Sequence, residues 1–334
     1  MGVMRREPTE GKAMRTVLHV GPSQTRGGMG AVIQLLAGNS PSGWRAEMMA
    51  SHSDGGIFPV LKAWWKVRKD LDARLQRKNV DIVHIHTATR WSWKRKKGLI
   101  AIAQKAGIPV ILSLHSGDFD RHCEERGPEV HRICSTVHTV VLTDLWLERL
   151  SPWLGNSSVI PNPVPDVPIS TERNQMEFLL MGRPNPMKGQ SIAMDAVRQL
   201  RETGLNVILH LTGMEHNEPG IVGHGWVDGV QKERLLSTCG TLLSPSKWEG
   251  LSMSVIEAMA RGMPVLASKA STGVFEKSGE IIDSTASAYA DAMRQIIEGK
   301  NWEKMALAGP KEAEKYALKR VVSMWGQLYD EVVI

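Results

Sequence analysis

Residues Ser244–Ser268, SPSKWEGLSMSVIEAMARGMPVLAS, decide the fold class of this chain. The apolar run Leu242–Ser244 predicts a buried strand, Met253–Arg261 predicts a helix, and Pro264–Ala267 predicts a second strand. A strand, a turn, a helix and another strand in this order form a βαβ unit. Ligands of such units bind at the carboxyl ends of the strands, which is where Glu249 stands.

The same alternation of strands and helices continues in both directions. Further strands are predicted at Arg15–Gly21, Asp81–His86, Pro109–His115, Thr139–Thr143, Ser158–Pro161, Glu177–Met181 and Asn206–Thr212, and further helices at Ser191–Thr203 and Arg320–Val333. Pro161, Pro163 and Pro165 interrupt the pattern and predict a domain boundary. We therefore expect an α/β protein with two Rossmann-like domains facing across a cleft. The expected parts are a flexible tail (1–14), a first domain (15–163) to which helix 320–334 returns, and a second domain (164–319).

The composition excludes several classes of protein. With 334 residues, 42% of them apolar and 23% charged, the chain is long enough for two cores and is not of the disordered, collagenous or coiled-coil type. Cys123, Cys134 and Cys239 lack the spacing of a disulfide framework or a zinc ribbon, which favours a reducing compartment. The first 15 residues do not resemble a signal peptide, and no uncharged apolar run reaches the ~18 residues of a membrane span.

Charge is unevenly distributed along the chain. Residues 1–166 carry 23 lysines and arginines against 15 acidic residues, whereas residues 167–334 carry 18 against 20. Seven of the 11 tryptophans also lie in the first half. A basic first half predicts contact with a polyanion, and composition alone does not choose between a membrane and a nucleic acid.

The loop Gly182–Gly189, GRPNPMKG, carries two cations directly after a predicted strand. Arg183 and Lys188 at this position are suited to a diphosphate, because both can neutralise phosphate oxygens. Two loop cations by themselves are more often solvated than functional.

Two glutamates accompany them in the second domain. Glu249 follows a strand, and Glu257 lies on a helix that Ser252 or Ser254 can cap. The N-terminus of that helix would offer N–H groups to an anion while the carboxylates accept hydrogen bonds from hydroxyls. This arrangement suits a polyhydroxylated, phosphate-bearing ligand, and the alternative is two solvated glutamates.

These two segments together resemble the retaining glycosyltransferases of family 4, which have the GT-B fold. The resemblance includes the opening Gly-Gly pair, DIVHIHT, VILSLHSG, VIPNPV and HGWV, and it is denser in the second domain than in the first. It implies transfer of a sugar from a nucleotide-sugar donor, with retention of configuration and without a metal or other cofactor. In one respect the chain departs from the family: Leu251 and Ser252 stand where Phe-Gly is common, which leaves the identity of the donor open.

The resemblance also implies roles for individual residues. The catalytic residues would be Arg183, Lys188, Glu249 and His115, the two cations neutralising the diphosphate. The donor would be bound by Gly28, Gly182, Trp226, Val227, Gly250, Leu251, Ser252 and Glu257, with Glu257 on the ribose hydroxyls. We expect front-face substitution, in which the leaving diphosphate accepts the proton of the acceptor.

Histidines on the predicted strands allow two interpretations. His115 either closes a strand by bonding to backbone or lies near the reaction centre, and the family match favours the second. His84 and His86 share one face of a strand, where a structural role is favoured, because metal ligation by this pair lacks a third ligand.

The basic first half contains two segments with an interfacial character. Residues 59–78 have apolar residues at helical spacing among seven cations, and residues 90–97, RWSWKRKK, add two tryptophans and five cations. Tryptophan beside lysine and arginine is typical of contact with anionic lipid. An apolar stripe that is simply core is equally compatible, and nucleic-acid binding is disfavoured because a recognition motif is missing.

The expected function is therefore a retaining glycosyltransferase with a lipid-linked saccharide acceptor in surface polysaccharide or glycolipid synthesis. It would act from the cytoplasm, peripherally at the inner face of the membrane. The alternatives are a catalytically silent GT-B subunit that binds nucleotide or protein partners, and a GT-B sugar-nucleotide epimerase or phosphorylase. A dinucleotide enzyme is disfavoured because Ile33 occupies the third glycine position of GxGxxG.

Overall fold

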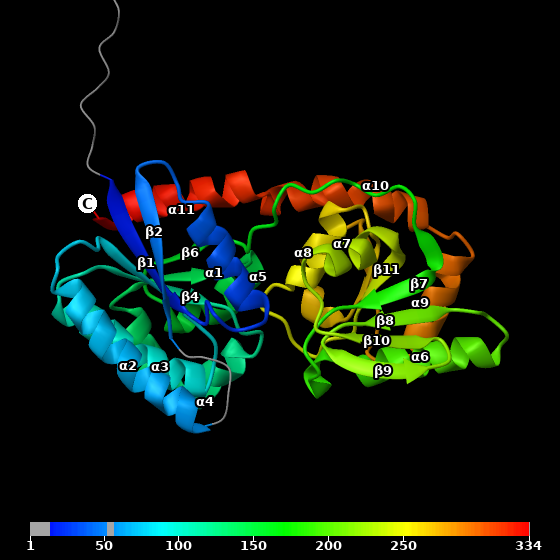
Figure 1. The fold of residues 1–334 in the computed structure, drawn as a ribbon, viewed down its shortest axis with the longest axis horizontal. Coiled ribbons are helices and arrows are strands. Elements are labelled where there is room, and N and C mark those ends of the chain that lie inside the picture. The colour runs from blue at the N-terminus through cyan, green and yellow to red at the C-terminus, as the bar shows by residue number, and fades with distance from the viewer. Residues whose placement is uncertain (1–13, 52–56, 334) are drawn as a thin grey trace, which may run out of the picture.

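The computed structural model describes residues 14–51 and 57–333, so almost all of the predicted tail lies outside the described residues. Two sheets, the first parallel and the second parallel except for one edge strand, lie side by side along the long axis of the molecule, and each is covered by helices on both faces (Figure 1). The predicted α/β architecture with two Rossmann-like halves is confirmed.

The first sheet has the strand order β2-β1-β3-β4-β5-β6, and its pairs are parallel. Its strands are β1 (Arg15–Gly21), β2 (Trp44–Ala50), β3 (Ile82–Thr87), β4 (Val110–Leu114), β5 (His138–Val141) and β6 (Ser157–Val159). The helices between them are α1 (Gly28–Gly38), α2 (Ile57–Leu75), α3 (Trp91–Lys105), α4 (Phe119–Cys134) and α5 (Asp144–Leu150), with a short 3₁₀ turn at Ser151–Trp153.

The second sheet has the order β13-β12-β11-β7-β8-β10-β9, in which β9 runs antiparallel to β10. Its strands are β7 (Asn174–Leu180), β8 (Ile208–Leu211), β9 (Met214–Glu218), β10 (Ile221–Gly225), β11 (Cys239–Ser244), β12 (Val265–Ala267) and β13 (Gly279–Ile281). Its helices are α6 (Gln190–Glu202), α7 (Gly229–Thr238), α8 (Met253–Ala260), α9 (Ala286–Ile297) and α10 (Trp302–Ala313), with 3₁₀ turns at Pro186–Lys188, Lys269–Ser271 and Glu314–Tyr316.

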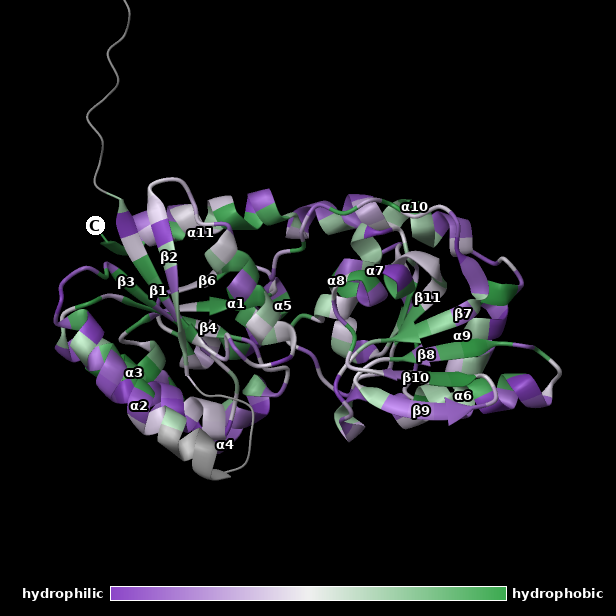
Figure 2. Ribbon diagram, viewed as in Figure 1, coloured by the Kyte–Doolittle hydropathy of each residue, from purple (hydrophilic) through white to green (hydrophobic). Residues whose placement is uncertain are grey.

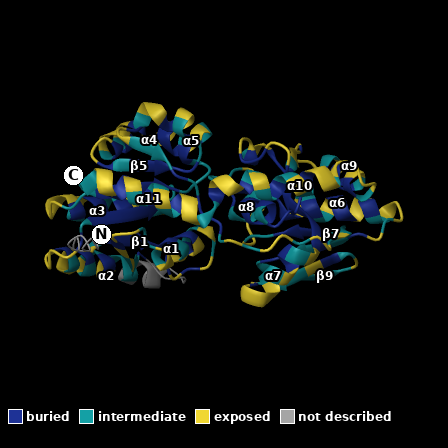
Figure 3. Cartoon of the chain, turned by 90° about the horizontal axis from the view of Figure 1, so that it is seen from above, coloured by how far each residue is buried: buried dark blue, intermediate teal, exposed yellow. Residues whose placement is uncertain are grey.

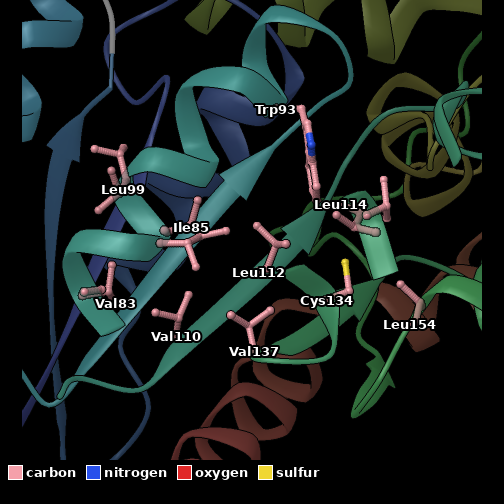
Figure 4. Packing of buried hydrophobic residues seen from close by; sticks show 14 of the residues in the cluster. Val83, Ile85, Trp93, Leu99, Val110, Leu112, Leu114, Cys134, Val137 and Leu154 are labelled. Atoms are coloured by element: carbon pink, nitrogen blue, oxygen red, sulfur yellow. The ribbon is translucent and has the colours of Figure 1, made fainter. Parts of the chain in front are cut away.

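Successive side chains of the buried strands point to opposite faces of the first sheet and pack in two separate cores. Val83 and Ile85 of β3 face α2, α3 and α4, and Figure 4 shows them packed with Leu99, Leu112 and their neighbours. The opposite face is covered by α1 and by α11 (Leu318–Val333), whose Trp325 and Tyr329 are buried against it. The apolar strands lie inside and the polar helix faces lie outside (Figures 2 and 3).

The chain crosses between the domains twice, and the two crossings run side by side. Val164 donates its N–H to the carbonyl of Tyr316 at 2.8 Å, and Leu318 donates to the carbonyl of Val164 at 2.9 Å. The helix α11 that follows packs on the first domain (Figure 1). The paired crossings leave the carboxyl ends of both sheets facing each other.

The basic segments divide between core and surface. On α2, Val67, Leu71 and Leu75 are buried in the core, so the apolar stripe that was compatible with lipid contact is core over its described part. On α3, Trp93 and Lys96 are each only 1% exposed. Two tryptophans of these segments remain at the surface, Trp65 with 65% and Trp91 with 70% of its area exposed.

None of the helices in the described ranges combines the length and the apolar character needed to cross a membrane.

Candidate functional site

A cleft of about 920 Å³ opens between the two domains, at the carboxyl ends of both sheets. The predicted catalytic and donor-binding residues all line it: Gly28, His115, Gly182, Arg183, Lys188, Trp226, Val227, Glu249, Gly250, Leu251, Ser252 and Glu257. Residues separated by up to 229 positions along the chain (from Gly28 to Glu257) are thus brought together by the facing of the two sheets.

The loop after β7 is rigid, which holds its two cations in place. Asn185 caps the 3₁₀ turn by accepting the N–H of Met187 at 3.0 Å, and Gln190 donates to the carbonyl of Arg183 at 2.8 Å. Gly189 ends the turn with φ 72°, a conformation that favours glycine. The aliphatic part of Lys188 lies over Gly182.

Arg183 reaches across the cleft toward the first domain. A Cβ on Gly27 would lie 2.8 Å from its Nη2, and Gly27 has φ 127°, so only glycine suits this position. Gly27 is also the N-cap of α1, whose first turn lines the cleft without a side-chain cap. A guanidinium therefore faces the positive end of a helix, and an anion between them would be stabilised by both. The sequence analysis named Gly28 as the donor-binding glycine of this loop. The glycine with a positive φ is its neighbour, Gly27.

Lys188 and Glu249 form an ion pair within the cleft. Nζ of Lys188 lies 2.5 Å from Oε1 of Glu249, and the glutamate side chain is 12% exposed. The pair keeps the carboxylate and the ammonium at the exits of two neighbouring strands, β11 and β7. Both groups are pre-positioned beside the same part of a ligand.

Glu257 is similarly paired, with a residue that sequence reasoning missed. Lys232, on the first turn of α7, places its Nζ 2.7 Å from Oε1 of Glu257, which is 8% exposed as a residue. The sequence feature that could have indicated Lys232 is Asp228-Gly229, at which α7 begins directly after the HGWV segment. The first turn of α7 therefore lies at the cleft. A ligand bound by Glu257 must therefore also accommodate Lys232.

The expected serine cap of α8 is wrong. Ser252 occupies the N-cap position, yet its hydroxyl bonds to the hydroxyl of Ser254 at 2.9 Å instead of to a backbone N–H. The first N–H groups of α8 are thus left without a side-chain cap, next to Leu251 and Met253 of the cleft wall. This favours anion binding more than the capped helix would.

His115 ends a chain of buried imidazoles. Its Nε2 lies 3.0 Å from Nδ1 of His86, and Nε2 of His86 lies 3.0 Å from Nδ1 of His19 on β1. Burial lowers the pKa of His115 and that of His19 to about 4, so both are neutral at neutral pH. The side chain of His115 is therefore oriented by its neighbours and not by backbone bonding.

The expectation that His84 and His86 lack a third partner is also wrong. His19 joins them, and nitrogen atoms of the three rings lie within 4.8 Å of one another. Sequence reasoning missed His19 because it lies 65 residues away, on a strand that pairs with β3. Both nitrogens of His84 are occupied by hydroxyls, those of Tyr329 at 2.9 Å and Ser113 at 2.8 Å, so the cluster is a hydrogen-bonded network.

A cation–π contact between two residues of the cleft joins the first domain to the second. The guanidinium of Arg26 lies 5.6 Å from the ring centroid of Trp226, which is 38% exposed. The exposed part of the Trp226 ring is a flat apolar surface that lies beside Val227 in the cleft. Such a surface suits stacking of a nucleobase.

Comparisons with known proteins identify a family that part of the chain matches. Residues 175–299 match the family described as "Glycosyl transferases group 1", which confirms the predicted resemblance at that level. An "Uncharacterized 41.2 kDa protein in cps region" of Klebsiella pneumoniae is 25% identical over 101 residues, which are 29% of this chain and 28% of that protein. Glycogen synthase of Mycobacterium tuberculosis is 23% identical over 219 residues, 56% of this chain and 52% of that protein. The chain thus spans about half or less of the curated relatives it matches.

Solved structures share the whole fold. Sucrose-phosphate synthase from Thermosynechococcus elongatus superposes with a TM-score of 0.76 at 16% identity, covering 95% of this chain and 98% of that one. The pneumococcal O-GlcNAc transferase GtfA, in complex with UDP and GlcNAc, superposes with a TM-score of 0.65 at 15% identity, covering 79% and 60%. The GT-B fold is therefore confirmed.

Proposed function

We propose, taking the match of residues 175–299 to the group 1 glycosyl transferases as the premise, that the chain is a retaining glycosyltransferase with a nucleotide-sugar donor. The observation that carries the proposal is the convergence in one cleft of Arg183, Lys188, Glu249 and Glu257 with the uncapped starts of α1 and α8. Two cations and two helix N-termini supply the positive charge that a leaving diphosphate needs, and the carboxylates accept from sugar and ribose hydroxyls.

In the proposed step the bond between the anomeric carbon and the diphosphate oxygen breaks, and the acceptor oxygen bonds to the same face of that carbon. The proton of the acceptor hydroxyl passes to the leaving diphosphate. Arg183 and Lys188 stabilise the charge on the diphosphate, Glu249 orients the sugar, and Glu257 holds the ribose. His115, held neutral by burial, would act as a hydrogen-bonding partner near the reacting carbon. We propose that the reaction needs no metal or other cofactor, because these cations already provide the electrostatic stabilisation.

The acceptor proposed is a lipid-linked saccharide in surface polysaccharide or glycolipid synthesis. In support, one relative is encoded in a cps region. In further support, Trp65 and Trp91 are exposed on α2 and α3, two helices that pack on each other. The chain would act on the cytoplasmic side, peripherally at the inner face of the membrane.

A panel of UDP-, GDP- and ADP-sugars tests the donor proposal. One donor should raise the melting temperature, should be hydrolysed slowly without acceptor in the presence of EDTA, and should give a product with the anomeric configuration of the donor by NMR. Glu257→Ala should lose the thermal shift, whereas Glu280→Ala, which removes an exposed glutamate from β13, should keep it. Donor binding without any turnover would favour the silent subunit, and an inverted product would contradict retention.

Flotation tests the membrane proposal. Binding to vesicles of phosphatidylglycerol and phosphatidylethanolamine should exceed binding to phosphatidylcholine and should fall with salt. The double variant Trp65→Ser/Trp91→Ser should lose it. Leu307→Ser, which removes an 81% exposed apolar residue from the second domain, is the matched control. Equal flotation of the three proteins would remove the membrane from the proposal.

A further inference from the structure

Two cations of α3 have a side-chain nitrogen that is buried without a hydrogen-bond partner among the residues that the structure describes. Arg95 lines the cleft on the side of the first domain, and its Nε is buried without a hydrogen-bond partner. Lys96 follows it with a side chain that is 99% buried, and its Nζ is also without a partner. By contrast, the next residue, Lys97, is paired with Glu129 at 2.9 Å. Among the described cations of residues 90–97, a buried nitrogen without a hydrogen-bond partner is found at these two residues alone.

Lys96 does not itself line the cleft, but its charge acts on His86, a neighbour of the cleft residue His115. Burial, and after it the charge of Arg95, lowers the pKa of Lys96 to about 7. Lys96 in turn acts on the pKa of His86, whose ring bonds to His115 in the wall. An unpaired buried amine is costly, and a methionine of similar length would pack among Trp93 and Leu99 without that cost. A bound anion that interacts with this amine would explain why a lysine stands at position 96.

The start of α3 adds to the positive potential at this place. Ser92, in the first turn, lines the cleft, and the N-cap residue Arg90 offers no side-chain cap to the helix. The helix has 15 residues and its N-terminal end therefore carries an appreciable partial positive charge. A helix terminus, a guanidinium and an ammonium all favour an anion at the same wall.

We infer that the acceptor substrate carries a phosphate or diphosphate group, which binds to Arg95 and the first turn of α3 and is stabilised from the interior by the charge of Lys96. The inference rests on the proposed function, because the donor diphosphate would occupy Arg183 and Lys188 on the opposite wall. The two anion sites would hold the donor and the acceptor on the two domains and bring them together in the cleft. A lipid diphosphate and a free sugar phosphate share this chemistry.

Calorimetry with inorganic pyrophosphate, on protein saturated with UDP at constant ionic strength, tests the inference. A binding event should remain in the presence of UDP, should weaken at least tenfold in Arg95→Gln and Lys96→Met, and should persist in Lys94→Gln, which removes the exposed neighbouring cation that lies over the Trp91 ring. Pyrophosphate that binds only in the absence of UDP, or that binds all variants equally, would overturn it.

Thermal unfolding gives a second readout. Lys96→Met should melt at a higher temperature than the parent chain and should no longer be stabilised by pyrophosphate. A lower melting temperature would show that the amine has a structural partner and would contradict the inference.

Competition then identifies the source of the group. Displacement of pyrophosphate by farnesyl diphosphate would indicate a lipid acceptor, and displacement by glucose 6-phosphate a soluble one; displacement by neither overturns the inference. These measurements need no turnover. A chain that binds pyrophosphate as expected but transfers no sugar would refute the proposed function alone, and the reverse result would refute this inference alone.

Discussion

Gly117→Ala should open the cleft without unfolding either domain. Gly117 lies in the turn after β4, and a Cβ at this position would lie 2.5 Å from the Cα of Glu249, with the N and C atoms of the same residue closer still. The contact is reciprocal, because a Cβ on Gly250 would lie 2.5 Å from the carbonyl oxygen of His115. The backbones on both sides of the cleft therefore interlock at two glycines.

The cost of the Gly117→Ala clash depends on the fact that the atoms it meets belong to the backbone of Glu249. Backbone atoms, unlike the end of a flexible side chain, yield only if the domains separate. Overpacking of this kind costs about 1–3 kcal/mol. The cost falls on the closed arrangement, since the three atoms nearest to the added methyl group all belong to Glu249 of the other domain. A coupling energy of this size corresponds to a change of roughly 5–150-fold in the population of the closed form.

Nucleotide-sugar affinity, small-angle scattering and thermal unfolding together measure this effect. The alanine variant should bind the donor roughly 5–150-fold more weakly, should have a larger radius of gyration, and should melt near the parent temperature. Gly38→Ala is the control, because its Cβ would meet no atom within 4 Å. Unchanged affinity and scattering in Gly117→Ala would refute the interlocking, and a large loss of melting temperature would place the clash inside a domain.

Other expectations follow from the site itself. Arg183→Ala and Lys188→Ala should each lower turnover on the order of 10²–10³ with a smaller effect on KM, measured by steady-state kinetics; unchanged turnover would remove the diphosphate role. Glu257→Ala should raise the dissociation constant for the nucleotide, measured by calorimetry, and should leave Lys232 without its partner. The free energy of unfolding should fall as the pH drops from 6.5 toward 4, because the pKa values of His19 and His115 are lowered to about 4 in the fold and their protons bind first to the unfolded chain. Each histidine contributes up to about 3 kcal/mol, and a flat pH profile in urea titrations would contradict their burial in the neutral form.

The strands that sequence reasoning located are those with continuous apolar runs. Arg15–Gly21 was predicted with its observed bounds, because six of its seven residues are buried. The edge strand β2 and the hairpin of β9 and β10 were missed. Their residues are half-buried, and MEHNE of β9 has the polar composition of a loop. Such strands form because a neighbouring strand supplies hydrogen-bond partners, and this is not visible in the local sequence.

For the site, the sequence revealed groups held by local motifs and missed those placed by long-range packing. Arg183 and Glu249 could be found because each lies in the loop that follows a predicted strand. Lys232 and His19 could not, since each acts through a residue on another element, Glu257 and His86 respectively. Helical phase is the other limit: residues 90–97 read as one basic surface, yet the start of α3 at Trp91 turns Lys96 into the interior.

The excess charge of the first domain therefore has two components that salt should separate. Lys94 is a surface cation, stacked on the exposed Trp91, and its attraction to anionic lipid would be screened over the Debye length of about 8 Å at physiological ionic strength. Arg95 lines the cleft and the adjacent Lys96 is buried in the interior, and a phosphate bound in the cleft would be shielded from ions by the protein around it. Raising the salt concentration to about 0.5 M, where the screening length is shorter still, should abolish vesicle binding while pyrophosphate binding falls much less. Parallel loss of both would mean that the cations act as one diffuse field, and the separation of a membrane surface from an acceptor site would then be wrong.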